Sequence, residues 1–163
     1  MADKKIVSPR ITLITAQSAP VVVVILRVRS KWWHVVKINE SGEAEHGSWF
    51  HGAKLMVDTC VLNHDGSFMS YVATSTGFGG WSGLCRPPWL KAFVSIYEPM
   101  PFGSRGSIGF PDIRTVSLPK REIHESEQAQ VAKKILGQKM GIRKAAIMVN
   151  HYEIFFVNGM KKV

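Results

Sequence analysis

Histidine, aspartate and cysteine gather in residues 60–73, which read CVLNHDGSFMSYVA. Within this stretch His64 and Asp65 are adjacent, and a His–Asp pair is a frequent component of acid–base and metal sites. Neighbours in sequence do not align their side chains, however, and such a pair needs a third group. Asp before Gly between two apolar runs is typical of a hairpin, because both residues tolerate positive φ. We therefore predict that residues 63–66 form a turn in which His64 and Asp65 serve the structure.

The other histidines and the two cysteines form weak patterns for catalysis. His46 and His51 lie five residues apart in a region that reads as strands, where this spacing would point them to opposite faces. Cys85 precedes Arg86, whose charge could lower a thiol pKa, but no nucleophile elbow or phosphate loop accompanies it. We predict no catalytic residue, no metal and no cofactor. A metal-assisted hydrolase that uses His46, His51 and His64 is the third functional hypothesis.

Tryptophans and arginines in two Gly- and Pro-rich segments are the stronger functional signal. Residues 75–89 (STGFGGWSGLCRPPW) and 99–111 (PMPFGSRGSIGFP) are predicted to be loops. Loops on a rigid sheet often carry recognition, and Trp and Arg are favoured at binding hot spots. The predicted partner-binding residues are Trp81, Arg86, Trp89, Phe102 and Arg105. Three other tryptophans, Trp32, Trp33 and Trp49, are expected to fold inward against the sheet.

The positive charge of the chain lies toward its two ends. The formal net charge is +9, and residues 1–40 carry seven Lys or Arg against two acidic residues. Residues 111–163 carry ten against five. A basic excess can keep a protein soluble, and it also favours acidic partners such as nucleic acid. The second hypothesis is therefore a nucleic-acid-binding protein that uses Lys4, Lys5, Arg10, Lys139, Arg143 and Lys144.

Apolar runs and turn signals predict a β-rich α+β fold. Expected strands cover residues 21–29, 32–38, 44–50, 54–62, 67–74, 90–97 and 113–118, followed by a helix over 122–136 and strands over 145–149 and 153–157. The predicted organisation is an N-terminal arm (1–19), a core of one antiparallel β-meander (20–118), and a helix with terminal strands packed on that core (119–163). Two cysteines, and the lack of an apolar signal core or of about 18 consecutive apolar residues, predict a cytoplasmic protein with no membrane contact.

Several short motifs occur in a fixed order along the middle of the chain: GSWFHG (47–52), DTCVLNHDGSFMSYVA (58–73), CRPPWLKAFVSIYEP (85–99) and GSIGF (106–110). Over residues 20–110 this order resembles an uncharacterised bacterial protein family to which no activity is assigned. Asn63-His64 stands where that family has Ser-Pro, and the segment after Pro111 is not part of the pattern. The Asp-Gly hairpin also resembles a blade of a β-propeller. A blade cannot bury both of its faces alone, so a blade-like sheet should pack on a helix or on a partner.

These observations favour a module without enzymatic activity of its own. It would act as a binding or assembly subunit, presenting its Gly, aromatic and Arg loops to a macromolecular partner. The partner would be another protein or a second copy of the chain, in an oligomer or a larger complex.

Overall fold

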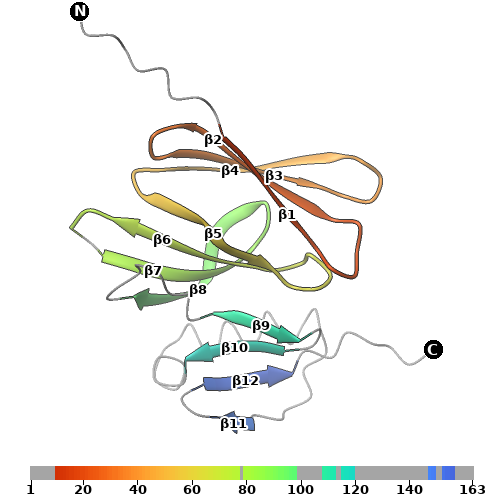
Figure 1. Cartoon of the computed structure of the whole chain (residues 1–163), viewed down its shortest axis with the longest axis vertical. Coiled ribbons are helices and arrows are strands. Elements are labelled where there is room, and N and C mark those ends of the chain that lie inside the picture. The colour runs from red at the N-terminus through yellow and green to blue at the C-terminus, as the bar shows by residue number, and fades with distance from the viewer. Residues whose placement is uncertain are drawn as a thin grey trace, which may run out of the picture.

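The described residues of the chain form three sheets. The computed structural model describes residues 10–77, 79–98, 108–112, 115–119, 147–149 and 152–156. They form three four-stranded antiparallel sheets that follow one another along the molecule (Figure 1). The prediction of a β-rich antiparallel meander is thereby confirmed, and the helix predicted over residues 122–136 lies outside the described part. Among the residues described, no helix is long and apolar enough to cross a membrane.

The first sheet has the strand order β1-β2-β3-β4. Its strands are β1 (Arg10–Thr15), β2 (Val22–Arg29), β3 (Trp32–Ile38) and β4 (Ala44–His51). The sequence of β2 begins VVVIL, a run of five apolar residues that is typical of a strand with two apolar faces. The expectation of a loose arm over residues 1–19 is wrong for residues 10–15, because each of them pairs with a residue of β2.

The second sheet has the strand order β5-β6-β7-β8. Its strands are β5 (Lys54–Leu62), β6 (Met69–Ser75), β7 (Gly79–Arg86) and β8 (Trp89–Glu98). The prediction that residues 75–89 form a loop is wrong, because most of them form β7. Glycine in this strand has a packing role: a Cβ on Gly83 would lie 2.5 Å from the ring of Tyr71 on β6. The Gly-rich composition of β7 resembles that of a loop, but it allows the ring of Tyr71 to lie against the strand backbone.

The third sheet combines two parts of the chain that are distant in sequence. Its strands are β9 (Gly109–Asp112), β10 (Thr115–Pro119), β11 (Ile147–Val149) and β12 (Tyr152–Phe156), in the order β11-β12-β10-β9. β12 pairs antiparallel with β10 over five residues. The terminal strands predicted over 145–149 and 153–157 therefore occur, and they extend the sheet begun by β9 and β10.

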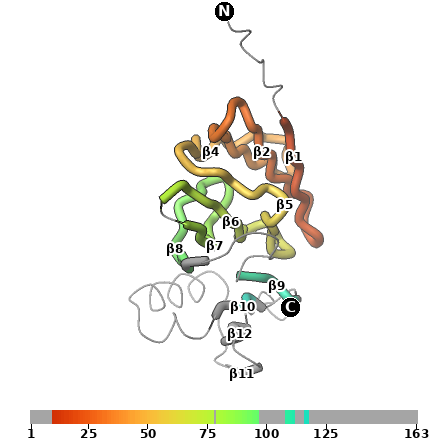
Figure 2. Tube along the Cα trace, turned by 60° about the vertical axis from the view of Figure 1, so that its left-hand side comes forward, coloured from red at the N-terminus to blue at the C-terminus, as the bar shows by residue number. Residues whose placement is uncertain are grey.

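Equivalent strands of successive sheets lie next to one another. β1 contacts β5, β5 contacts β9, and β4 contacts β8. Figure 2 shows the same succession in a second view, with β5 between β1 and β9. First strands that meet on one side and fourth strands that meet on the other are characteristic of β-propeller blades. The single meander expected over residues 20–118 is therefore two blade-like sheets and the start of a third.

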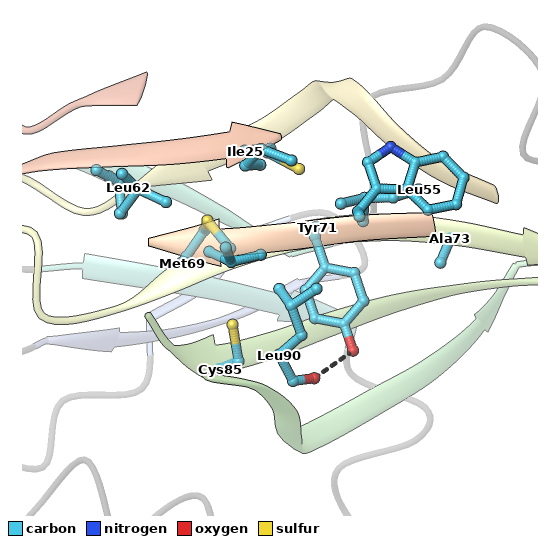
Figure 3. Close-up of a cluster of buried hydrophobic side chains, with 12 residues drawn as sticks. Ile25, Leu55, Leu62, Met69, Tyr71, Ala73, Cys85 and Leu90 are labelled. Atoms are coloured by element: carbon cyan, nitrogen blue, oxygen red, sulfur yellow. Dashed lines mark hydrogen bonds between the residues drawn. The ribbon is translucent and has the colours of Figure 1, made fainter. Parts of the chain in front are cut away.

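The first and second sheets share one apolar core. The buried side chains of the first sheet are Val23, Ile25, Trp33 and Val35, and those of the second include Leu55, Leu62, Met69, Tyr71, Cys85 and Leu90 (Figure 3). The Tyr71 hydroxyl donates a 2.9 Å hydrogen bond to the carbonyl oxygen of Leu90. Burial raises the pKa of Tyr71 to about 12, although a hydrogen bond with Trp81 acts in the opposite direction. A neutral phenol with its hydrogen bond satisfied is therefore part of this core.

The outer strands of these two sheets are joined by backbone contacts. Ser48 N donates to the Pro88 carbonyl oxygen at 3.1 Å, and Leu90 N donates to the Ser48 hydroxyl at 2.9 Å. A Cβ on Gly47 would overlap the backbone of Pro88, so only glycine allows this approach. β4 and β8 are thus held in one register, which fixes the first sheet against the second.

The predicted turn at residues 63–66 is confirmed, and its centre is Asn63. Gly66 has a φ of 74° and donates from its backbone to the Asn63 carbonyl oxygen at 3.1 Å. The Asn63 side chain is buried, accepts from Phe68 N at 2.9 Å and donates to Asp65 Oδ1 at 2.8 Å. The turn depends on an amide side chain that satisfies backbone and side-chain groups at once.

Replacing Asn63 with alanine should lower the free energy of unfolding by about 2–3 kcal/mol, because a buried N–H of Phe68 loses its acceptor. The matched control is His64→Ala in the same turn, which should change it by less than about 0.5 kcal/mol, since no hydrogen bond of the His64 side chain supports the turn. Urea denaturation followed by tryptophan fluorescence measures both variants. A larger loss for His64→Ala than for Asn63→Ala would contradict this account of the turn.

Candidate functional site

The predicted partner-binding residues do not form one loop surface. Trp81 lies in β7 and packs against the core shared by the first two sheets. Arg86 is half-buried at the end of the same strand. Trp89 begins β8 with 51% of its surface exposed and donates through Nε1 to Glu45 Oε1 at 3.3 Å. Phe102 and Arg105 lie outside the described residues. Of the five residues, Trp89 alone stands in the described structure as an exposed aromatic side chain.

Of the residues proposed for nucleic-acid binding, one belongs to the described part of the chain. Arg10 is exposed at the beginning of β1 and pairs with Arg27 of β2. The other five, Lys4, Lys5, Lys139, Arg143 and Lys144, lie outside the described residues. The hypothesis that the basic ends bind nucleic acid therefore stays a prediction for those five residues.

The His64–Asp65 pair is engaged by the turn itself. The His64 backbone carbonyl accepts from the backbone N and from the hydroxyl of Ser18, each at 2.8 Å. Asp65 Oδ1 accepts from Ser67 N at 2.9 Å and from the Ser67 hydroxyl at 2.6 Å. Burial alone would raise the pKa of Asp65, but the hydrogen bonds from Ser67 and Asn63 and the charge of Lys37 lower it below its ordinary value. The carboxylate is a structural acceptor here.

The lowered pKa of Asp65 predicts a pH dependence of stability. Because the folded-state pKa lies below the unfolded one, the stabilisation is fully present above about pH 5 and is lost as the pH falls through the folded-state pKa. Unfolding free energies measured between about pH 6 and pH 3 should fall more steeply for the natural chain than for Asp65→Asn. Parallel curves for the two proteins would show that this carboxylate does not contribute.

Both cysteines are buried thiols in the core. Cys85 is fully buried, and Cys60 is 8% exposed. Burial, together with the charge of Asp58, raises the pKa of Cys60 to about 12. Burial also raises the pKa of Cys85 well above its usual range. A thiol nucleophile needs a lowered pKa and access to solvent, so the structure gives Cys85 no catalytic role despite its neighbour Arg86.

Thiol labelling should reflect this burial. At pH 8 the folded chain should release no thionitrobenzoate from dithionitrobenzoate during a period in which the urea-unfolded chain releases two equivalents, one from each cysteine. Rapid release of one equivalent by the folded protein would show that a thiol is accessible and reactive.

Histidines of the first sheet are brought together in a way that the sequence does not indicate. His34 Nε2 lies 3.0 Å from His46 Nδ1, and His34 Nδ1 lies 3.3 Å from the Ser48 carbonyl oxygen. The His34 ring also stacks on Trp49, with ring centroids 4.3 Å apart. Because a carbonyl oxygen can only accept, His34 Nδ1 is the donor in that bond, and His34 Nε2 shares the second hydrogen bond with His46 Nδ1. The buried imidazole is thereby oriented by two fixed partners.

A β-bulge explains why the spacing of these histidines misleads. His34 pairs with Trp49 and Val36 pairs with His46, with a register shift between the two pairs. The bulge keeps His46 on the same face as Trp49, and His51 follows on that face two residues later, so the expectation of opposite faces for His46 and His51 is wrong. His51 stacks on Trp32 at 4.7 Å between centroids. Within the part of the chain that is described, no three His, Cys, Asp or Glu side chains could hold a metal together.

One face of the first sheet, called here the open face, is apolar and partly exposed. Ile11, Leu13 and Trp49 are 66%, 64% and 57% exposed at the two edges of this face. The expectation that Trp49 folds inward is therefore wrong, as it is for Trp32, which is 45% exposed, whereas Trp33 is buried as expected. The paired residues of the open face form three rows across the sheet: Ile11–Leu26–His34–Trp49, Leu13–Val24–Val36–His46 and Thr15–Val22–Ile38–Ala44.

The two faces of the second sheet are both buried, unlike those of the first sheet. On β6, Met69, Tyr71 and Ala73 point to the core shared with the first sheet. The alternate residues Ser70 and Val72 are buried on the opposite face. As far as the described residues show, the second sheet is covered on both sides, whereas the first sheet has one covered face and the open face. This contrast makes the open face the candidate binding surface.

No protein-family model, curated protein or solved structure matches this chain. The resemblance of residues 20–110 to a bacterial family stays a prediction, and the site rests on the geometry alone.

Proposed function

We propose that the chain is a non-enzymatic binding and assembly module that packs the open face of its first sheet against another sheet. The observation that carries this proposal is β2, whose run from Val22 to Leu26 is apolar on both faces. Strands of this composition are characteristic of sheets covered on both sides. Among the described residues, the face that carries Val23 and Ile25 is the one that the second sheet covers.

The occupant we propose is a second copy of the chain. The rows of the open face consist mostly of aliphatic side chains, as does the face that already packs on the second sheet. The first sheet already packs one aliphatic face against the second sheet of the same molecule. Its open face, which is also aliphatic, can pack in the same way against a second copy. When the open faces of two copies meet in this way, the contact is isologous and closes as a dimer.

The expected affinity can be bounded from the exposed side chains. Ile11, Leu13 and Trp49 are each about three-fifths exposed, so covering all three would contribute about 3–6 kcal/mol. Association of two proteins costs about 4–15 kcal/mol in lost freedom. The contact must therefore also cover the half-buried residues of β2, and it should be studied at high protein concentration.

Sedimentation equilibrium at about 200 µM should give a mass above that of the 18.2 kDa chain. The variant Leu13→Lys places a charge in the middle row of the open face and should return the protein to a monomer. The matched control is Val61→Lys, which alters a 46% exposed aliphatic residue of β5 outside the open face and should leave the mass unchanged. A monomeric natural chain at this concentration, or equal effects of both variants, would contradict self-assembly through this face.

A further inference from the structure

Positive side chains gather at one end of the first sheet, where the β2–β3 turn lies beside the beginnings of β1 and β5. We call this group the basic end, and it consists of Arg10, Arg27, Arg29, Lys31 and Lys54. Strand pairing places Arg10 directly opposite Arg27, and Arg29 opposite Trp32. Residues 27–34 and 49–54, which form most of this end, contain no acidic residue.

The acidic residues of the first sheet lie at its opposite end. Glu40 and Glu43 lie in the β3–β4 connection, and Glu45 pairs with Lys37 near that connection. The first sheet is thus positive at the end formed by the β2–β3 turn and negative at the end formed by the β3–β4 connection. A surface divided in this way attracts an anionic partner to one end only.

Two features of the basic end are unfavourable for the free protein. Arg10 and Arg27 are like charges in directly paired positions, which destabilises a sheet. Lys31 has a φ of 58°, in the left-handed region where glycine is relaxed and a lysine is strained. Strain of this kind is common at ligand-binding positions. A ligand that neutralises the charge would relieve the repulsion between Arg10 and Arg27.

Aromatic rings lie among these cations. Trp32 is 45% exposed and stacks on His51, with centroids 4.7 Å apart and planes inclined by 21°. The Arg27 guanidinium lies 5.9 Å from the centroid of the Trp33 ring, a distance that allows a cation–π contact. Cations that follow a phosphate backbone, combined with an exposed ring on which a base can stack, are the features of single-stranded nucleic-acid sites.

We propose that the basic end binds single-stranded nucleic acid, with phosphates held by Arg10, Arg29, Lys31 and Lys54 and a base stacked on Trp32. Of the six residues considered for nucleic-acid binding from the sequence, the site includes Arg10, and its other members are new. Trp32 lies on the same side of the sheet as the open face, beyond the row from Ile11 to Trp49, but the site uses none of the residues of the three rows.

The test is fluorescence anisotropy of a labelled oligothymidylate of about 16 nucleotides, titrated with the full chain at several salt concentrations. Binding should be saturable at low salt and should weaken linearly in log K against log salt, with a slope of about −0.7 for each phosphate contact. Trp32→Ala should weaken binding at least about fivefold, because one stacked base is lost. The matched control Trp89→Ala removes a similarly exposed tryptophan at the opposite end of the second sheet and should leave the affinity unchanged.

Charge variants separate this site from general attraction to a basic protein. Arg29→Glu should weaken binding and make the salt slope shallower, whereas Lys91→Glu, the same change of charge at an exposed position in β8, should have a smaller effect. Lys31→Gly should lower affinity while the melting temperature stays equal or rises, since glycine relaxes the turn. This variant keeps the test decisive, because a loss of binding cannot then be attributed to unfolding.

Equal losses for Arg29→Glu and Lys91→Glu, unchanged binding by Trp32→Ala, or no saturable binding at low salt would each overturn the proposal. Tighter binding to vesicles of phosphatidylserine than to the oligonucleotide would also overturn it, in favour of a membrane surface. Self-assembly is read out separately by Leu13→Lys, so failure of one proposal leaves the other standing.

Discussion

The arrangement of this chain depends on the packing of apolar sheet faces against one another. A sheet with two apolar faces exposes each face that no other layer covers. In this molecule Val23, Ile25 and Val35 of the first sheet meet Leu55, Leu62 and Met69 of the second, which buries one face of each. The close contact of Gly47 with Pro88 then fixes the relative position of the outer strands. Once this contact is set, both the covered face and the open face of the first sheet are determined.

The local elements follow largely from the sequence. Apolar runs and turn residues predict β3 and β5 with their observed bounds, and the Asp-Gly signal predicts the turn at residues 63–66. These features are local, because they depend on alternation and on which residues tolerate positive φ. The Asp-Gly signal does not predict the hydrogen bonds of Asn63. The Asn63 side chain, which precedes His64 and Asp65, is the group that holds the turn together.

The predictions from the sequence that the structure contradicts fail because they depend on contacts between residues that are distant in sequence. The sequence does not predict β7, because its glycines resemble those of a loop. Gly83 is instead required by packing, since the Tyr71 ring lies where a Cβ would be. The hydrogen bond between the His34 and His46 side chains depends on a bulge in β4, because one extra residue reverses which face a side chain occupies. Trp49 and Trp32 were expected to be buried, yet burial is decided by whether a second layer covers that face. A sequence reports how apolar a strand is, but it does not report which layer meets it.

The open face and the basic end divide the first sheet between two kinds of surface. The rows from Ile11 to Trp49 and from Leu13 to His46 are apolar or aromatic, and a hydrophobic contact there does not weaken as salt screens charges. The residues around the β2–β3 turn are cationic and exposed, and any contact with an anion there must weaken as salt screens the charges. Because β2 contributes Val24 and Leu26 to one surface and Arg27 and Arg29 to the other, a partner at either surface would restrain the same central strand. The two surfaces share no residue, although Trp32 adjoins the open face, and a partner at either surface would stabilise the strand on which the other depends.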